Sequence, residues 1–416
     1  MGIIKRAAAL AASAALALGL AGCGGAEPEF QGKTLTVLYP SGVYAEAARS
    51  VASEFTAATG ADLRVVDLPR EQLLEAILTN AEGESALYDA VAADARWDGA
   101  LSPHLYGLGT YIAKAEEEGT LTLADFEPKV LDSCGSWQGS VYGIPFAAAP
   151  RLFAYRTDIY PDGPAARWDD YLREAADQSR DGFYGLSLGG SGGQLGELYE
   201  LLLRGMGGTL ETADSPEGRA ALKALRTLRD SGAASPDWPE WDAETAADAF
   251  LAGNAAICQS QPTWGLALRA DDPAQSAIVG NWALCLPPSA DGTAELEAWS
   301  LGICANTQQP DLAWEWIRMF TLPANQVRFY EEYGILPPRS SFWERDGTTG
   351  TPMEEIHAAL VRATPPLRVS AAAEAQALLD TELRAFLSGS READETISRL
   401  DDGLSRILRN THELPD

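Results

Sequence analysis

The clearest nucleophile pattern in the chain is a serine among four glycines, Gly-Gly-Ser-Gly-Gly at residues 189–193. The motif Gly-x-Ser-x-Gly presents a reactive serine on a sharp turn between a strand and a helix, and the neighbouring residues predict that context. A serine hydrolase also needs an acid and a histidine after Ser191, where His357 and His412 lie in helical stretches with a surface-like pattern. The glycines fit a flexible loop equally well, so we expect no catalysis by Ser191. A glycosidase is harder to exclude, because 60 acidic residues produce many accidental carboxylate pairs.

Aromatic side chains at predicted strand ends are suited to binding. A tryptophan ring offers a rigid apolar face to the C–H face of a sugar, while nearby polar groups address its hydroxyls. Trp97 follows Asp94 at the end of one predicted strand, and Trp264 follows the strand at 255–259 with Gln261 beside it. Each of these residues is a candidate ligand contact, and each fits ordinary packing as well.

Alternating strand and helix patterns would position these side chains. In the first part of the chain the predicted strands are 35–39, 63–66 and 88–92, and the predicted helices are 45–58 and 70–81. This alternation predicts an α/β domain with a largely parallel sheet, in which ligands bind at the carboxyl ends of the strands. Tyr44 lies in the loop after the first strand, near a helix start whose N–H groups can donate to a ligand.

A second α/β region is predicted after residue 146. Its first strands are expected at 152–155 and 184–188, and its first helices at 168–178, 194–204 and 216–231. Later in the chain, strands are expected at 255–259, 282–286 and 299–305, and helices at 310–320 and 324–333. The tail from 371 to 410 is predicted to be helical, with a break at Ser-Gly-Ser, 388–390. A chain of 416 residues exceeds what one hydrophobic core usually supports, so we expect two domains.

The charge of the chain excludes several classes of partner. It carries 31 Lys and Arg against 60 Asp and Glu, a formal net charge of −29. Nucleic acids and anionic lipid surfaces require clusters of basic residues, and the basic residues here are scattered singly. We expect no nucleic-acid partner, and we interpret the acidity as a device for solubility.

The N-terminus has the properties of an export signal. Lys5 and Arg6 precede a 14-residue apolar run at 7–20, which is too short to span a bilayer. Leu-Ala-Gly-Cys at 20–23 resembles the lipobox of bacterial lipoproteins, which implies cleavage before Cys23 and a lipid on its thiol. The residues that follow Cys23 then form a short flexible tether to the membrane.

The remaining cysteines leave two readings open. Cys134, Cys258, Cys285 and Cys304 allow three fully paired connectivities. Three of them lie in short apolar runs, which favours packed thiols, while a bridge between Cys285 and Cys304 is the best disulfide candidate in an exported chain. The spacing of cysteines and histidines supports no zinc site, and we expect no metal and no cofactor.

The order of motifs from about residue 33 to 410 resembles the family 1 extracellular solute-binding proteins, the capture subunits of ABC importers. The matching motifs are Phe-Thr-Ala-Ala-Thr-Gly at 55–60, Tyr-Asp-Ala-Val-Ala-Ala-Asp at 88–94, Tyr-Gly-Ile-Pro at 142–145 with Tyr-Arg-Thr-Asp at 155–158, Trp-Asp at 168–169, Phe-Leu-Ala-Gly-Asn-Ala-Ala at 250–256 with Trp264, and Ala-Trp-Glu-Trp-Ile at 313–317 with Gly-Ile-Leu-Pro at 334–337. The chain departs from the family pattern at Arg156 and Arg167, close to the hinge, which affects the choice of ligand rather than the fold.

The resemblance implies a two-lobed α/β fold of the periplasmic-binding-protein type (type II), with hinge strands between discontinuous lobes. The implied segments are a signal peptide at 1–22, a lipid anchor and tether at 23–32, an N-lobe at 33–147 with a return at 287–338, and a C-lobe at 148–286 with C-terminal helices at 339–416. Arg151 and Trp299 would then lie at two strand crossings near 146–152 and 286–299. At the hinge, the Arg151 guanidinium either donates to a ligand or pairs with an acid.

The resulting expectation is a monomeric, extracytoplasmic receptor, tethered through Cys23, that delivers a sugar or short oligosaccharide to an ABC permease. The expected ligand contacts are Tyr44, Asp94, Trp97, Arg151, Gln261, Trp264 and Trp299. The alternatives are a receptor for a small charged solute such as a polyamine, a lipoprotein that senses its ligand for a membrane partner, and a surface hydrolase using Ser191.

Overall fold

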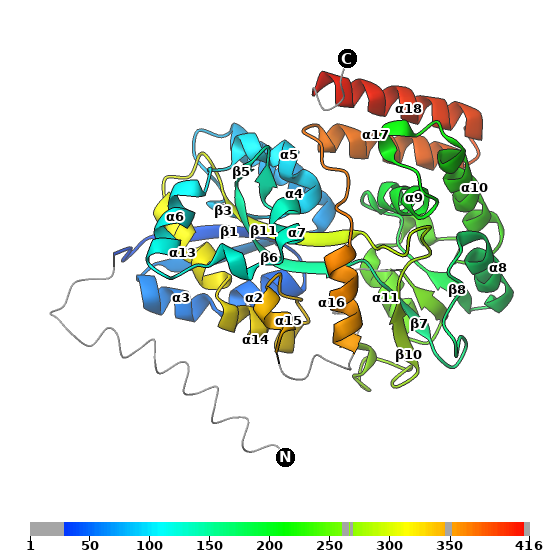
Figure 1. Ribbon diagram of the computed structural model, residues 1–416, viewed down its shortest axis with the longest axis horizontal. Helices are drawn as coiled ribbons and strands as arrows, with labels where there is room; N and C mark the ends of the chain where they lie inside the picture. The colour runs from blue at the N-terminus through cyan, green and yellow to red at the C-terminus, as the bar shows by residue number, and fades with distance from the viewer. Residues whose placement is uncertain (1–28, 260–265, 267–268, 346–351, 412–416) are drawn as a thin grey trace.

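Two β-sheets, each at the centre of its own lobe, organise the computed structural model (Figure 1), which describes residues 29–259, 266, 269–345 and 352–411. The sheet of the N-lobe has the order β2 (Asp62–Leu68), β1 (Thr34–Pro40), β3 (Ala90–Asp94), β11 (Leu296–Ile303) and β6 (Gly143–Pro150). All five residues of β3 are buried, as expected for a central strand covered on both faces.

The N-lobe sheet is mixed rather than largely parallel. β1 pairs in parallel with β2 and β3, but β11 pairs antiparallel with both β3 and β6. The reason is the hinge: β6 carries the chain out of the N-lobe and β11 brings it back, so the two adjacent strands run in opposite directions. The predicted parallel arrangement therefore holds for the first three strands alone.

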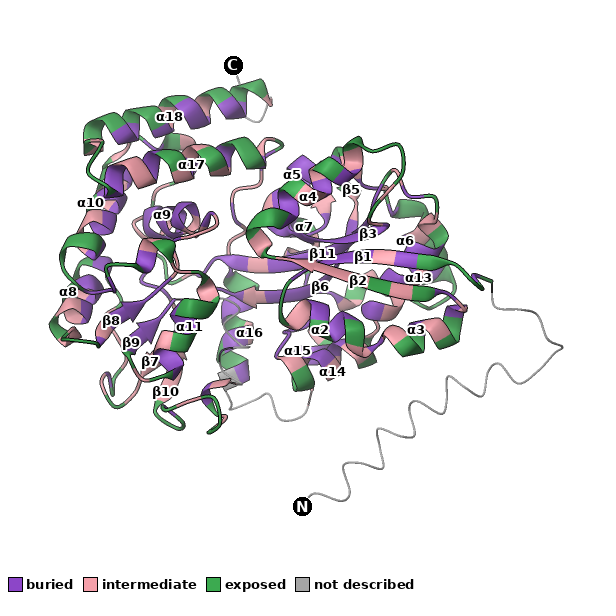
Figure 2. Ribbon diagram, turned by 180° about the vertical axis from the view of Figure 1, so that it is seen from behind, coloured by how far each residue is buried: buried purple, intermediate pink, exposed green. Residues whose placement is uncertain are grey.

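Helices cover both faces of the N-lobe sheet, with α2, α3 and α14 on one face and α4 and α5 on the other (Figures 1 and 2). The bounds are α2 (Val43–Ser50), α3 (Ala52–Thr59), α4 (Arg70–Glu82), α5 (Asp98–Leu101), α6 (Gly109–Glu117), α7 (Pro128–Ser133), α13 (Pro310–Phe320), α14 (Pro323–Tyr333) and α15 (Ser340–Trp343). The single helix predicted at 45–58 is divided at Val51. α3 ends at Gly60, whose φ of 78° gives the left-handed cap that the Thr-Gly motif predicted.

The C-lobe contains the sheet β10 (Trp282–Cys285), β7 (Phe153–Arg156), β9 (Ala255–Cys258) and β8 (Tyr184–Ser187). Its helices are α8 (Trp168–Gln178), α9 (Gln194–Gly205), α10 (Pro216–Asp230), α11 (Ala243–Leu251), α17 (Ala372–Leu387) and α18 (Ala393–Asn410). α8 packs so closely on β8 that a Cβ at Gly185 would lie 1.9 Å from the carbonyl oxygen of Ala175. α17 and α18 form an antiparallel pair over α9 and α10, with one face buried and the other exposed (Figure 2).

Within the described residues, the chain crosses between the lobes three times. Two crossings lie where they were expected, between β6 and β7 at Arg151 and between β10 and β11. The third lies at 363–371, between α16 (Pro352–Arg362) and α17, rather than at the expected boundary of 339. The reason is that α15 stays with the N-lobe, where the rings of Tyr330 and Phe342 lie 4.9 Å apart, and α16 packs on β6.

The crossing segment 363–371, called the strap below, is attached to both lobes. From the C-lobe, Arg204 donates a hydrogen bond of 2.8 Å to the carbonyl oxygen of Pro365. On the N-lobe side, Arg368 donates to the carbonyl oxygen of Ser136 at 2.9 Å and pairs with Asp98 at 3.2 Å. The strap therefore links the lobes through side-chain contacts as well as through the backbone.

The four described cysteines are thiols, and the proposed bridge between Cys285 and Cys304 is wrong. Cys285 lies on β10 of the C-lobe, whereas Cys304 follows β11 in the N-lobe, where Asn80 donates to its sulfur at 3.3 Å. Burial raises the pKa of each of these two thiols to about 12. The reading as packed thiols is thus confirmed. Across the described ranges, no helix combines the length and hydropathy needed to span a bilayer.

Candidate functional site

A cleft of about 890 Å³ lies between the two lobes and is lined by residues of both. The N-lobe contributes the loop and helix start after β1, the start of α4 and the segment 332–336; the hinge contributes parts of β6 and β11; the C-lobe contributes the glycine turn 189–192, α9, α11 and Gln259. This volume and its concave, mixed polar and apolar lining are typical of a small-molecule binding site.

Three of the predicted ligand contacts, Tyr44, Arg151 and Trp299, line this cleft. Asp94 and Trp97 lie behind its wall. Gln261 and Trp264 lie outside the described residues, as does Cys23. The structure thus brings together side chains that are more than 250 positions apart in the sequence.

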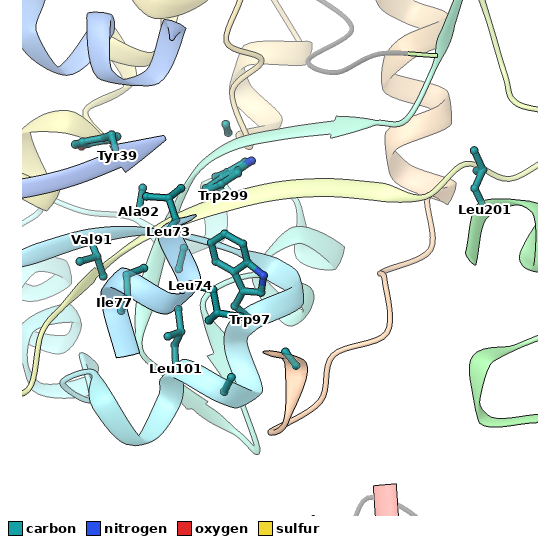
Figure 3. Close-up of a cluster of buried hydrophobic side chains, with 14 of the residues drawn as sticks. Tyr39, Leu73, Leu74, Ile77, Val91, Ala92, Trp97, Leu101, Leu201 and Trp299 are labelled. Atoms are coloured by element: carbon teal, nitrogen blue, oxygen red, sulfur yellow. The ribbon is translucent and has the colours of Figure 1, made fainter. Parts of the chain in front are cut away.

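The aromatic side chains form one wall of the cleft. Trp299 lies 5.7 Å from the ring of Tyr44, which in turn meets Phe146 edge-on at 5.3 Å. Trp97 packs its edge against Trp299 at 5.7 Å and is only 4% exposed (Figure 3). Trp97 therefore supports the ring of Trp299 and offers no face to the cleft in this structure. Among the described tryptophans, Trp299, which lies beside a β-bulge at residues 299 and 300, is the one that lines the cleft.

The base of the cleft is a network of buried ion pairs centred on Arg151. This arginine contacts three carboxylates, those of Glu197 at 3.2 Å, Glu295 at 3.4 Å and Glu297 at 2.9 Å. Pairing with acids was one of the two roles expected for Arg151, and here its charge is shared among three of them. It also lies on the cleft surface, so both a structural and a ligand-facing role are consistent with its position.

Two arginines of the N-lobe reach across the cleft base to α9 of the C-lobe. Arg70 binds Glu197 at 2.5 Å and Asp94 at 2.6 Å, and so connects the lobes while anchored in its own. Arg96 pairs with Glu200 at 3.0 Å. Although burial opposes the ionisation of Glu197, the surrounding guanidinium groups outweigh it and hold the pKa of this carboxyl well below its usual range.

Glu297 is a cleft residue that the sequence analysis missed. Burial raises the pKa of its carboxyl to about 7, despite the partly offsetting charge of Arg151. A signal was present: residues 295–299 read Glu-Leu-Glu-Ala-Trp, and alternation along a strand places Glu295 and Glu297 on the same face as Trp299. The intervening Leu296 and Ala298 are buried in a separate apolar cluster, in agreement with that alternation.

Gln259 is a second polar residue of the cleft. It follows β9, is 9% exposed, and donates from Nε2 to the hydroxyl of Tyr171 at 2.9 Å. Its Oε1 atom is buried and has no hydrogen-bond partner. An unsatisfied buried acceptor in a cleft is available to a ligand donor, since leaving it unpaired costs free energy.

The glycine turn at 189–193 does not assemble a catalytic triad with the described histidine. Gly192 and Gly193 take φ values of 58° and 88°, which makes the turn one of left-handed glycines next to the cleft. His357 lies on α16, stacks on Trp343 at 4.9 Å and contacts Glu127 at 2.9 Å. His412 lies outside the described residues. Gly189 and Gly192 of this turn line the cleft, and Ser191 is not paired with the described His357.

Comparison with known proteins supports this description. A model of the family described as bacterial extracellular solute-binding proteins matches residues 50–352. A probable amino-acid ABC transporter periplasmic-binding protein of Sinorhizobium fredii is 21% identical over 165 residues. The match spans 38% of that relative's length and 38% of this chain.

Solved structures of solute-binding proteins have the same fold. A protein of Agrobacterium radiobacter K84 in complex with ribitol has a TM-score of 0.81 at 23% identity, covering 91% of this chain and 100% of that one. Maltose-bound MalE3 of T. maritima has a TM-score of 0.79 at 20% identity, with 90% and 100% covered. A protein of Agrobacterium vitis S4 with bound D-mannitol reaches 0.75 at 19% identity, with 91% and 99% covered. The predicted two-lobed α/β fold with hinge strands is confirmed.

Proposed function

The chain belongs to the bacterial extracellular solute-binding protein family, and from that premise we propose that it captures a sugar or polyol for an ABC importer. The observation that carries the proposal is the cleft between the lobes, bordered by Trp299 and Tyr44 on one side and by polar groups at its base. Two lobes joined by strand crossings can close around a solute and present the closed form to a permease.

The lining of the cleft supports a polyhydroxylated ligand. The rings of Trp299 and Tyr44 provide apolar surface for C–H groups, while the carboxylate of Glu297 and the amide of Gln259 can accept hydrogen bonds from hydroxyls. The related structures with bound ribitol, maltose and D-mannitol point in the same direction. Gln261 and Trp264, adjacent to Gln259 in sequence, remain predicted ligand contacts.

We further propose that Cys23 carries the lipid that holds the receptor at the membrane. The export signal at 1–22 and the lipobox at 20–23 support this, and a tethered receptor delivers its ligand without diffusing away. In a bacterial host, Cys23→Ser should move the protein from the membrane fraction to the soluble fraction. A variant that remains with the membrane and still incorporates a radiolabelled fatty acid would contradict the assignment.

Direct binding tests the receptor function. Isothermal titration of the soluble domain from residue 29 with ribitol, D-mannitol and maltose should give saturable binding to at least one ligand, without turnover by chromatography. Trp299→Leu keeps an apolar side chain but removes the ring, and it should weaken binding at least tenfold, whereas Trp343→Leu, on the N-lobe away from the cleft, should not. Hydrolysis of maltose that is abolished by Ser191→Ala would refute the proposal in favour of an enzyme.

A further inference from the structure

We propose that the solute captured by this cleft is cationic: a polyhydroxylated molecule that carries a basic nitrogen, with its ammonium group bound at Glu297. The inference rests on the proposed function as a receptor and specifies the chemical class of its ligand. It is based on the inventory of charges in the cleft, on the placement of Glu297 and on the unsatisfied acceptor of Gln259.

Acidic side chains outnumber basic ones on the described surface of the cleft. The acidic lining residues are Glu46, Glu71, Glu197, Asp242, Glu244, Glu297 and Glu332. The basic lining residues are Arg70, Arg151 and Arg269. All three arginines are already paired with carboxylates, because Arg269 contacts Asp248 outside the cleft and the other two belong to the network at its base. A negative potential in a low-dielectric cleft attracts cations and repels anions.

The network at the base of the cleft contains one more carboxylate than guanidinium group. Its described members are Asp94, Glu197, Glu200, Glu295 and Glu297 against Arg70, Arg96, Arg151 and Arg204. Asp94 and Glu297 each pair with a single arginine that is shared with other carboxylates, and of these two Glu297 lines the cleft. The contact of 2.9 Å between Arg151 Nε and Glu297 Oε1 is also misaligned, and both atoms lack a hydrogen-bond partner of good geometry.

The raised pKa of Glu297 agrees with this surplus, since burial without a full counter-charge disfavours the ionised carboxylate. A cationic ligand would supply the missing charge. Glu297 lines the cleft, and Trp299, two positions later on the same face of the strand, provides aromatic surface there. One ligand can therefore contact both residues.

Gln259 is independent evidence for a ligand that donates hydrogen bonds. Its Oε1 is a buried acceptor without a partner, on a residue that lines the cleft. An ammonium group offers three donors and no acceptor, so it can satisfy this amide oxygen or Glu297 without leaving an acceptor of its own unpaired. A carboxylate-bearing ligand would instead place acceptors against acceptors.

Matched pairs of ligands test the proposal on the unmodified protein. Isothermal titration should compare D-glucitol with D-glucamine, D-glucose with D-glucosamine, and both sets with spermidine. We expect the amine of at least one pair to bind at least tenfold more tightly than its neutral counterpart, with a difference that decreases as salt increases. Equal or weaker binding of the amines would overturn the inference while leaving the receptor function intact.

A variant without the charge of Glu297 tests whether this residue produces the preference for amines. Glu297→Gln keeps the size of the side chain and should remove most of the preference for the amine, whereas Glu240→Gln, an exposed residue paired with Arg384 outside the cleft, should retain it. Circular dichroism establishes that each variant is folded. A preference that persists in folded Glu297→Gln would overturn the role of Glu297. Binding of spermidine without any sugar or polyol would refute the proposed function while supporting the charge selectivity, and binding of no compound in the panel would overturn both.

Discussion

The ion pair between Arg70 and Glu197 should hold the two lobes together, and its removal offers a direct test of the cleft. Arg70 extends from α4 of the N-lobe and Glu197 from α9 of the C-lobe, with 2.5 Å between Nη1 and Oε1. Arg70→Met keeps the apolar stem but removes the charge. Glu197 then retains Arg151 at 3.2 Å, whereas Asp94 loses its ion pair with Arg70. The pair between Arg96 and Glu200 still joins the lobes, so the substitution weakens the contact between them without abolishing it.

The magnitude follows from the partial burial of this pair. The side chain of Arg70 is 27% exposed and that of Glu197 is 13% exposed, so the pair lies between the surface and buried limits. Exposed pairs contribute about 0–1 kcal/mol and breaking a fully buried pair costs about 3–5 kcal/mol, which places this one at about 1–2 kcal/mol. That free energy corresponds to roughly a fivefold to thirtyfold shift toward the open arrangement.

Small-angle X-ray scattering of the ligand-free protein measures this shift. Arg70→Met should increase the radius of gyration of the ligand-free protein, and a saturating ligand should return it to the wild-type value. The affinity of the variant for this ligand should be lower than that of the wild type by up to the same fivefold to thirtyfold factor. Arg49→Met removes a pair with Asp67 within the N-lobe and provides the matched control. If Arg70→Met and wild type give superimposable scattering curves and equal affinities, the pair does not stabilise closure and the reasoning is wrong.

Two further predictions concern stability, and a third concerns the oxidation state of the cysteines. The pKa of Glu297 is raised from 4.5 to about 7, so its contribution to the free energy of unfolding is fully present below pH 4.5 and is lost as the pH rises through 7. In urea unfolding, the free energy of unfolding of Glu297→Gln should therefore rise relative to that of the wild type by up to about 3 kcal/mol between pH 4.5 and pH 8. A difference between the two proteins that does not change with pH would contradict this. Gly99→Ala should destabilise the protein by about 1–3 kcal/mol, because its Cβ would lie 2.8 Å from the backbone carbon of Val369 in the strap; an unchanged melting temperature would show that the strap yields freely. Alkylation under denaturing conditions without reductant should label both Cys285 and Cys304, whereas labelling that requires prior reduction would indicate a disulfide that the structure lacks.

Much of the local structure was predictable because it is encoded in contiguous residues. The helices at 168–178 and 310–320 have the predicted bounds, since apolar residues at helical spacing and prolines or acids at the first turn mark them directly. Tyr44 was predicted near the helix start that follows the first strand, and it lies in the first turn of α2. Trp299 was predicted to open a strand and instead lies within β11, but both residues line the cleft as expected.

Other features of the site depend on contacts that no local pattern records. Trp97 has the sequence context of a ligand contact, but the return of β11 beside β3 places Trp299 in front of it. The alternation at residues 295–299 predicts that Glu297 lies on the same face of the strand as Trp299. The sequence does not show that the Glu297 carboxyl is buried or that its partner Arg151 also contacts Glu295, because these facts depend on contacts with other segments. The helices of the C-lobe were expected from residue 339, but α16 packs on β6 and the crossing follows it at 363–371, a position that no break in the sequence marks.

The sequence by itself determined the acidic composition, the alternation of strands and helices, and the family resemblance that implied two lobes, and its N-terminal pattern predicts an export signal. Each of these is a property of composition or of short-range periodicity. The tertiary structure alone decided which acids meet which arginines, because a pair such as Arg70 and Glu197 joins residues 127 positions apart across a hinge. Charge compensation in a buried cleft is a sum over such distant neighbours, so the surplus of carboxylates over guanidinium groups becomes visible only after the chain has folded.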